Sequence, residues 1–65
     1  MKRRELLRYL EAEGCRFLRE GGNHTVYINP QVEDGKGMIP RHAEIKDGLV
    51  RQICKDLEIP VPRKT

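Results

Sequence analysis

The chain has 65 residues, of which 13 are Lys or Arg and 10 are Asp or Glu, so its net charge is +3. A domain of this size buries only about 60% of the surface that its unfolded chain exposes, which leaves room for one thin core and excludes a separate substrate domain. The mild positive charge permits a polyanionic partner such as nucleic acid but does not require one.

Residues 2–13 are predicted to form a helix. Leu6, Leu7 and Leu10 lie on one narrow face at helical spacing, with charged residues opposite. The helix is expected to end at Gly14, because the residue just past a helix end often needs a positive φ.

Two short strands are predicted next, at residues 15–20 and 24–29. Residues with relaxed backbone limits make the tight turn between them: Gly21, Gly22 and Asn23. After a loop that closes on an Asp-Gly turn signal, residues 36–40 form a third strand. It ends at Pro40, because proline cannot donate to a ladder.

A second helix is predicted within residues 47–58, where five apolar residues share one stripe: Leu49, Val50, Ile53, Cys54 and Leu57. The order α-β-β-β-α predicts a two-layer α+β domain, in which two amphipathic helices cover one face of a three-stranded antiparallel meander. Double-stranded RNA-binding domains have the same order. Residues 1–59 would form this single domain and residues 60–65 an extended tail.

Cysteine usage and hydropathy indicate a cytoplasmic protein. Cys15 and Cys54 are predicted to be buried thiols in a reducing compartment, although the sequence leaves a bridge between them open. The basic N-terminus is not followed by the apolar region of a signal peptide. No run approaches the ~20 apolar residues of a membrane span, so no membrane partner is expected.

His24 is the first candidate for a catalytic residue. An imidazole titrates near pH ~6.5 and can give or take a proton. Cleavage of RNA needs a base for the 2′-hydroxyl and an acid for the leaving oxygen, and histidine can serve as either. The alternative is that His24 packs beside Val26 and Ile28, with which it shares strand parity.

His42, just after the third strand, is the second candidate, as the partner acid or base or as a phosphate contact. The alternative is an exposed loop histidine. The sequence has none of the paired spacings typical of zinc ligands, so no metal and no cofactor is predicted. A Cys–His nucleophilic dyad is also disfavoured, because both cysteines fall where core residues are expected.

Five cations flank the two histidines in sequence and are candidates for binding RNA phosphates: Arg16, Arg19, Lys36, Arg41 and Lys46. The alternative for each is a solvated surface charge. Tyr27 could stack on a base, as aromatic side chains do with single-stranded RNA, or it could cover the sheet.

With these segments in place, the sequence resembles the HicA/YcfA-like family of mRNA interferase toxins. Three stretches carry the resemblance: KRRELLRYLEAEGC, REGGNHTVYINP and IPRHAEIKDGLVRQICKDLEIP. They contain the G-x-H turn, P-x-H, E-I-K-x-G and I-C-K-x-L at specific separations, and together they run over nearly the full chain.

The resemblance implies a double-stranded RNA-binding-like fold that cleaves mRNA with a histidine and without a metal. The family's catalytic histidine corresponds to His24, its glycine-rich turn to Gly22 and Asn23, and its P-x-H histidine to His42. Asn23 stands where relatives often have serine. The implied partners are mRNA and a HicB-type antitoxin that covers the active surface.

Two other functions remain open from the sequence. The chain could be a non-catalytic RNA-binding module of the same fold, or a small domain that only binds a partner protein. His24 separates the nuclease from the RNA-binding module, because a pure binder gains nothing special from an imidazole at this position.

Overall fold

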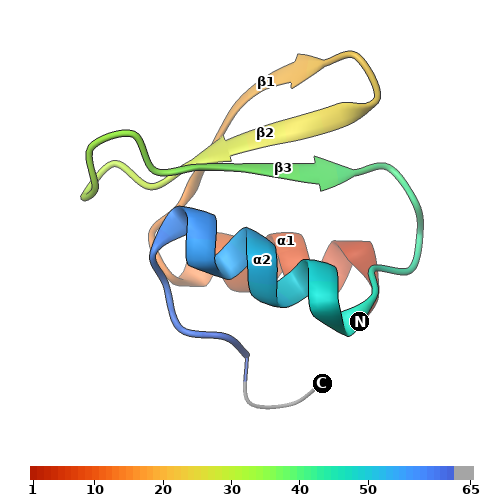
Figure 1. Ribbon diagram of the computed structural model, residues 1–65. Coiled ribbons are helices and arrows are strands. Elements are labelled where there is room, and N and C mark those ends of the chain that lie inside the picture. The colour runs from red at the N-terminus through yellow and green to blue at the C-terminus, as the bar shows by residue number, and fades with distance from the viewer. Residues whose placement is uncertain (63–65) are drawn as a thin grey trace.

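A sheet and a layer of two helices form the structure of residues 1–62, which a computed structural model describes (Figure 1). The elements in chain order are α1 (Arg3–Ala12), β1 (Arg16–Gly21), β2 (His24–Ile28), β3 (Lys36–Pro40) and α2 (Asp47–Leu57). The strand order is β1-β2-β3, and both neighbouring pairs are antiparallel. The expected α+β order is therefore confirmed. No observed end of a helix or strand differs from the expected one by more than one residue. Residues 63–65 of the expected tail lie outside the described residues.

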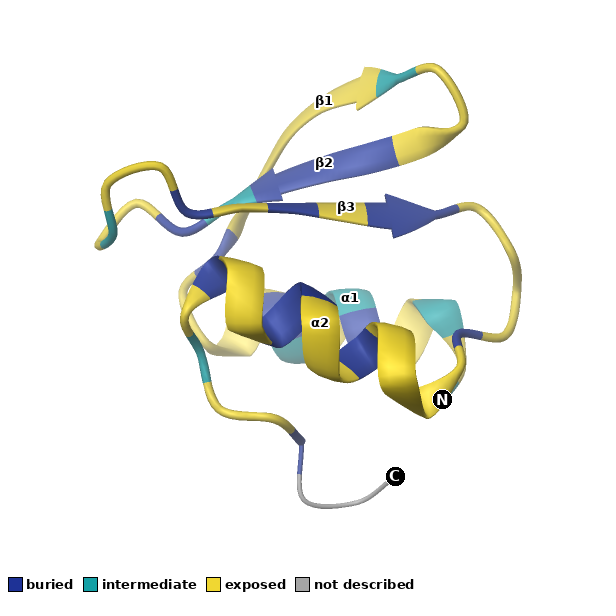
Figure 2. Cartoon of the chain, viewed as in Figure 1, coloured by how far each residue is buried: buried dark blue, intermediate teal, exposed yellow. Residues whose placement is uncertain are grey.

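Both helices lie on the same face of the sheet and turn their apolar stripes toward it (Figure 2). The core includes Leu6 and Leu10 of α1 and four residues of α2: Val50, Ile53, Cys54 and Leu57. Leu49 was expected in this stripe but is 39% exposed. It lies about 100° around the helix from Val50, and so at the margin of the stripe.

The sheet supplies Tyr27 and Ile39 to the core, and Ile45 joins them from the connection between β3 and α2. Tyr27 is 4% exposed, and its hydroxyl donates a hydrogen bond to Oε2 of Glu11 at 3.0 Å. The ring of Tyr27 therefore packs in the core between the sheet and the helices. The interpretation of this ring as a base-stacking platform is wrong. No helix of residues 1–62 lies on the opposite face of the sheet, which is called the uncovered face below.

The N-terminal segment fixes the connection that follows β3. The backbone N–H of Arg3 donates to the carbonyl of Ala43 at 2.8 Å, and the N–H of Ile45 donates to the carbonyl of Met1 at 2.8 Å. The amino group of Met1 also pairs with Oε2 of Glu44 at 2.8 Å. These bonds and the buried side chain of Ile45 together anchor this loop.

Gly37→Ala is expected to lower the free energy of unfolding by about 1–3 kcal/mol, the usual effect of overpacking a core. Helix α2 rests directly on this residue of β3. A Cβ atom there would lie 2.9 Å from Cδ1 and 3.0 Å from Cγ of Leu57, and 3.3 Å from Cγ2 of Ile53. Urea unfolding measures the change. Gly48→Ala is the matched control, because a Cβ there meets nothing within 4 Å; equal stability of the two variants would contradict the close contact.

Candidate functional site

His24 opens the central strand β2, directly after a two-residue turn of Gly22 and Asn23. Two-residue hairpin turns of types I′ and II′ both need a positive φ at their first residue, and Gly22 has a φ of 56°. Gly21 was expected in this turn but is the last residue of β1. The side chain of His24 is exposed, so it is not buried beside Val26 and Ile28.

The strand register brings the two histidines to the same end of the sheet. His24 lies opposite Pro40, the last residue of β3, and His42 follows two residues later. Asn23, His24, Arg41 and His42 line one hollow of about 410 Å³. A hollow formed by exposed side chains at a sheet end suits one segment of a long ligand, not an enclosed small molecule.

A β-bulge in β1 decides which of its side chains share the face of His24. Phe17 pairs with Tyr27, but the next pair is Arg19 with Val26, so Leu18 is the extra residue. A bulge of this kind shifts the alternation of side chains by one position. It places Arg19 on the uncovered face of the sheet and turns Glu20 toward the helices.

Two of the cross-strand rows on the uncovered face carry basic residues. Arg16 and Lys36 both pair in line with Ile28, and Arg19 pairs with Val26. Directly opposed residues of neighbouring strands lie on the same side of a sheet. These three cations and His24 therefore share one face, and no Asp or Glu occupies any of these rows.

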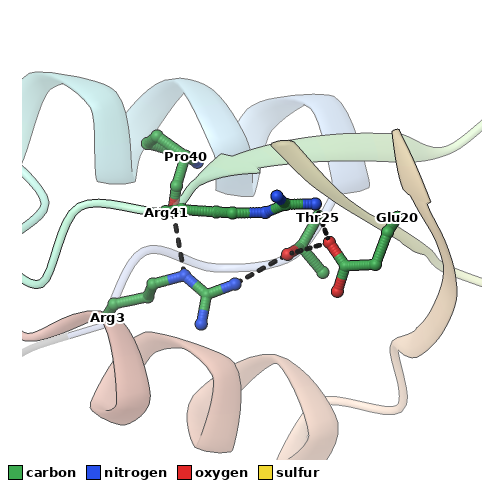
Figure 3. Close-up of polar contacts among 5 residues, drawn as sticks. All are labelled: Arg3, Glu20, Thr25, Pro40 and Arg41. Carbon is green, nitrogen blue, oxygen red and sulfur yellow. Dashed lines mark hydrogen bonds and ion pairs between the residues drawn. The ribbon is translucent and has the colours of Figure 1, made fainter. Parts of the chain in front are cut away.

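Four side chains form a hydrogen-bonded chain on the helix side of the sheet: those of Arg3, Thr25, Glu20 and Arg41 (Figure 3). Arg3 donates from Nε to the carbonyl of Pro40 at 3.0 Å and from Nη2 to Oγ1 of Thr25 at 2.6 Å. Thr25 donates to Oε1 of Glu20 at 3.0 Å, and Arg41 donates to the same oxygen at 2.6 Å.

These hydrogen bonds connect the start of α1 to the ends of all three strands, next to the hollow. The hydrogen bonds from Arg41 and Thr25 lower the pKa of Glu20 below its ordinary value, so that its carboxylate is charged at neutral pH. Sequence reasoning missed Arg3, Thr25 and Glu20. No local pattern marks them, because Arg3 and Thr25 are far apart in the chain and meet only after folding.

The remaining candidates lie elsewhere. Lys46 precedes α2 as its N-cap residue and is not among the residues that line the hollow. Cys15 and Cys54 are buried free thiols, so the bridge left open by the sequence is not formed. Burial raises the pKa of Cys54 to about 11 and raises the pKa of Cys15 as well. Thiols of this kind are poor nucleophiles at neutral pH.

In residues 1–62, no group of three or more His, Cys, Asp or Glu side chains is placed to hold a metal ion. Within the same residues, no helix is long and apolar enough to cross a membrane.

Comparison with known proteins adds a family to this geometry. A family model described as a HicA toxin of bacterial toxin-antitoxin matches residues 3–59, a span that includes all five helices and strands. Comparisons with curated proteins and with solved structures found no match.

Proposed function

The chain belongs to the HicA toxin family and is thus a toxin of a toxin–antitoxin system. We propose that it is an endoribonuclease that cleaves mRNA and that His24 is its catalytic residue. The observation that carries this proposal is the strand register. It places His24 on the uncovered face of the sheet together with Arg16, Arg19 and Lys36. Since its proposed substrate is mRNA, the protein is also proposed to act in the cytoplasm.

The proposed chemistry is a transesterification of the RNA backbone. The 2′-hydroxyl loses its proton to a base and its oxygen attacks the adjacent phosphorus, while the bond from phosphorus to the 5′-oxygen breaks. The departing 5′-oxygen takes a proton from an acid. The products are a 2′,3′-cyclic phosphate and a 5′-hydroxyl. His24 transfers one of the two protons. His42, the second histidine of the sequence, lines the same hollow and transfers the other.

The substrate is proposed to lie as a single strand along the uncovered face. Arg16 and Lys36 pair in line with Ile28, four residues along β2 from His24. At a rise of about 3.3 Å per residue, that distance is about 13 Å. The two cations would therefore bind phosphates beyond the cleaved one, and such contacts supply much of the affinity for a nucleic acid.

Cleavage is expected to continue in excess chelator, because two imidazoles can provide the acid and the base that a metal-bound water supplies in other nucleases. The test incubates the purified chain with RNA in EDTA and follows the 2′,3′-cyclic phosphate ends. Complete loss of cleavage in EDTA that a single divalent ion restores would contradict the metal-free mechanism. Wild-type protein that leaves RNA intact in both conditions would contradict the ribonuclease function itself.

A HicB-type antitoxin is the proposed partner, and it is expected to stop cleavage by covering the hollow around His24. A hollow lined by four exposed residues is open to a protein surface as well as to RNA. Purified toxin is titrated with its cognate antitoxin while cleavage is followed. A complex that forms at one to one yet cleaves RNA at the free rate would show that the antitoxin binds elsewhere.

A further inference from the structure

The space above Gly21 is filled by the side chain of Arg19. A Cβ atom on Gly21 would lie 2.6 Å from Nη1 and 3.7 Å from Cζ of Arg19, and 3.8 Å from Cγ2 of Val26. Gly21 does not have a positive φ, so the backbone does not require glycine there. The missing side chain at this position leaves room for a guanidinium group.

This guanidinium lies next to His24. Gly21 is the cross-strand partner of His24, and the Cβ positions of such partners are about 4.5–5.5 Å apart. Nη1 of Arg19 is therefore within about 8 Å of Cβ of His24. One phosphate group can bridge this gap, because each of its hydrogen bonds spans about 2.9 Å.

No carboxylate competes for Arg19 in the described part of the chain. The ion pairs of residues 1–62 join Arg41 to Glu20 and the Met1 amino group to Glu44. The bulge that turns Arg19 toward the uncovered face turns its neighbour Glu20 away from it. The donors of Arg19 are thus available for the paired oxygens of a phosphate, a geometry that guanidinium groups favour.

We propose that Gly21 and Arg19 form a phosphate-binding site beside His24, and that Arg19 is a further catalytic residue. This inference rests on the proposed ribonuclease function. When the 2′-oxygen bonds to phosphorus and before the bond to the 5′-oxygen has broken, negative charge builds up on the two non-bridging oxygens. The guanidinium of Arg19 binds those oxygens and stabilises the charge while His24 moves a proton.

The main test is Arg19→Gln, which removes the guanidinium; Gly21→Ala retains Arg19 and shifts the far end of its flexible side chain. We expect kcat of Arg19→Gln for RNA cleavage to fall by about 10²-fold, the usual effect of losing one donor to a developing charge. KM should rise much less. Gly21→Ala should have a smaller effect, and the double variant should be no slower than Arg19→Gln alone, because both changes act on one interaction.

Two control variants change the same residue types at other places. Gly48→Ala adds a methyl group to α2 where a Cβ meets nothing within 4 Å. Arg51→Gln removes one positive charge from the exposed side of α2, in the helix layer. Both should leave kcat unchanged. Wild-type kcat in Arg19→Gln, or a double variant that is slower than Arg19→Gln alone, would overturn the proposal. If Gly21→Ala fails to fold, the inference is decided by Arg19→Gln and Arg19→Lys, of which only the lysine variant should regain part of kcat.

A second measurement does not depend on cleavage. A 2′-O-methyl RNA oligonucleotide cannot be cut by this chemistry, and its affinity is measured at several salt concentrations. Loss of one phosphate contact should reduce the salt slope by about 0.7 in Arg19→Gln. An unchanged slope in Arg19→Gln would exclude the phosphate contact, even if the wild-type chain proves not to cleave RNA.

Discussion

His24→Ala is expected to cleave RNA about 10³-fold more slowly than the wild-type chain, the scale of losing a positioned group that transfers a proton. Expression of the variant should no longer arrest growth. The side chain of His24 is exposed and makes no side-chain hydrogen bond within the described residues, so its removal should change the free energy of unfolding by less than about 0.5 kcal/mol.

His24→Gln separates catalysis from RNA binding. Glutamine retains hydrogen-bonding capacity at this position but cannot take up a proton near neutral pH. We expect it to bind 2′-O-methyl RNA with nearly wild-type affinity while cleaving as slowly as His24→Ala. Cleavage at the wild-type rate in either variant would end the catalytic assignment and would favour an RNA-binding module that lacks this activity.

His42→Ala is expected to slow cleavage by about 10²-fold or more and to change the pH profile. The reaction moves two protons, and the register brings His42 to the hollow that contains His24. An acid and a base that act together give a bell-shaped dependence of the rate on pH. Loss of His42 should flatten one limb of this curve and leave the other limb in place.

The matched control for His42→Ala is Gln31→Ala. Gln31 is an exposed loop residue between β2 and β3, at the opposite end of the sheet from the hollow. The Gln31→Ala variant should retain both the wild-type cleavage rate and the complete bell-shaped pH profile. If His42→Ala also retains them, His24 must work with water or with a neighbouring cation as its partner.

Local sequence determined the elements of this fold. The spacing of Leu6 and Leu10 in α1, and of Val50, Ile53 and Leu57 in α2, matches the helical period, and all five side chains are buried. The short strands and their order also follow from local signals, namely β-rich runs punctuated by glycine and proline. Prediction of the α-β-β-β-α order therefore needed no tertiary information.

Part of the site was also visible in the sequence. The glycine and asparagine before His24 predict that it follows a tight turn, and Gly22 does take the positive φ that the hairpin requires. The sequence could not show that His42 lies at the same end of the sheet, since two strands can pair in several registers. The observed pairing of His24 with Pro40 decides this point.

Which cations face His24 was decided by the tertiary structure alone. Simple alternation along β1 from Arg16 would put Arg19 on the helix side and Glu20 on the open side. The bulge at Leu18 reverses both, so that Arg19 lies over Gly21 and Glu20 meets Thr25 and Arg41. Alternation is a local property of a strand, whereas a bulge depends on how the neighbouring strand pairs with it. The amino-acid sequence thus determined that a histidine and several cations would lie near this turn, and the pairing of β1 with β2 determined which of them share a face.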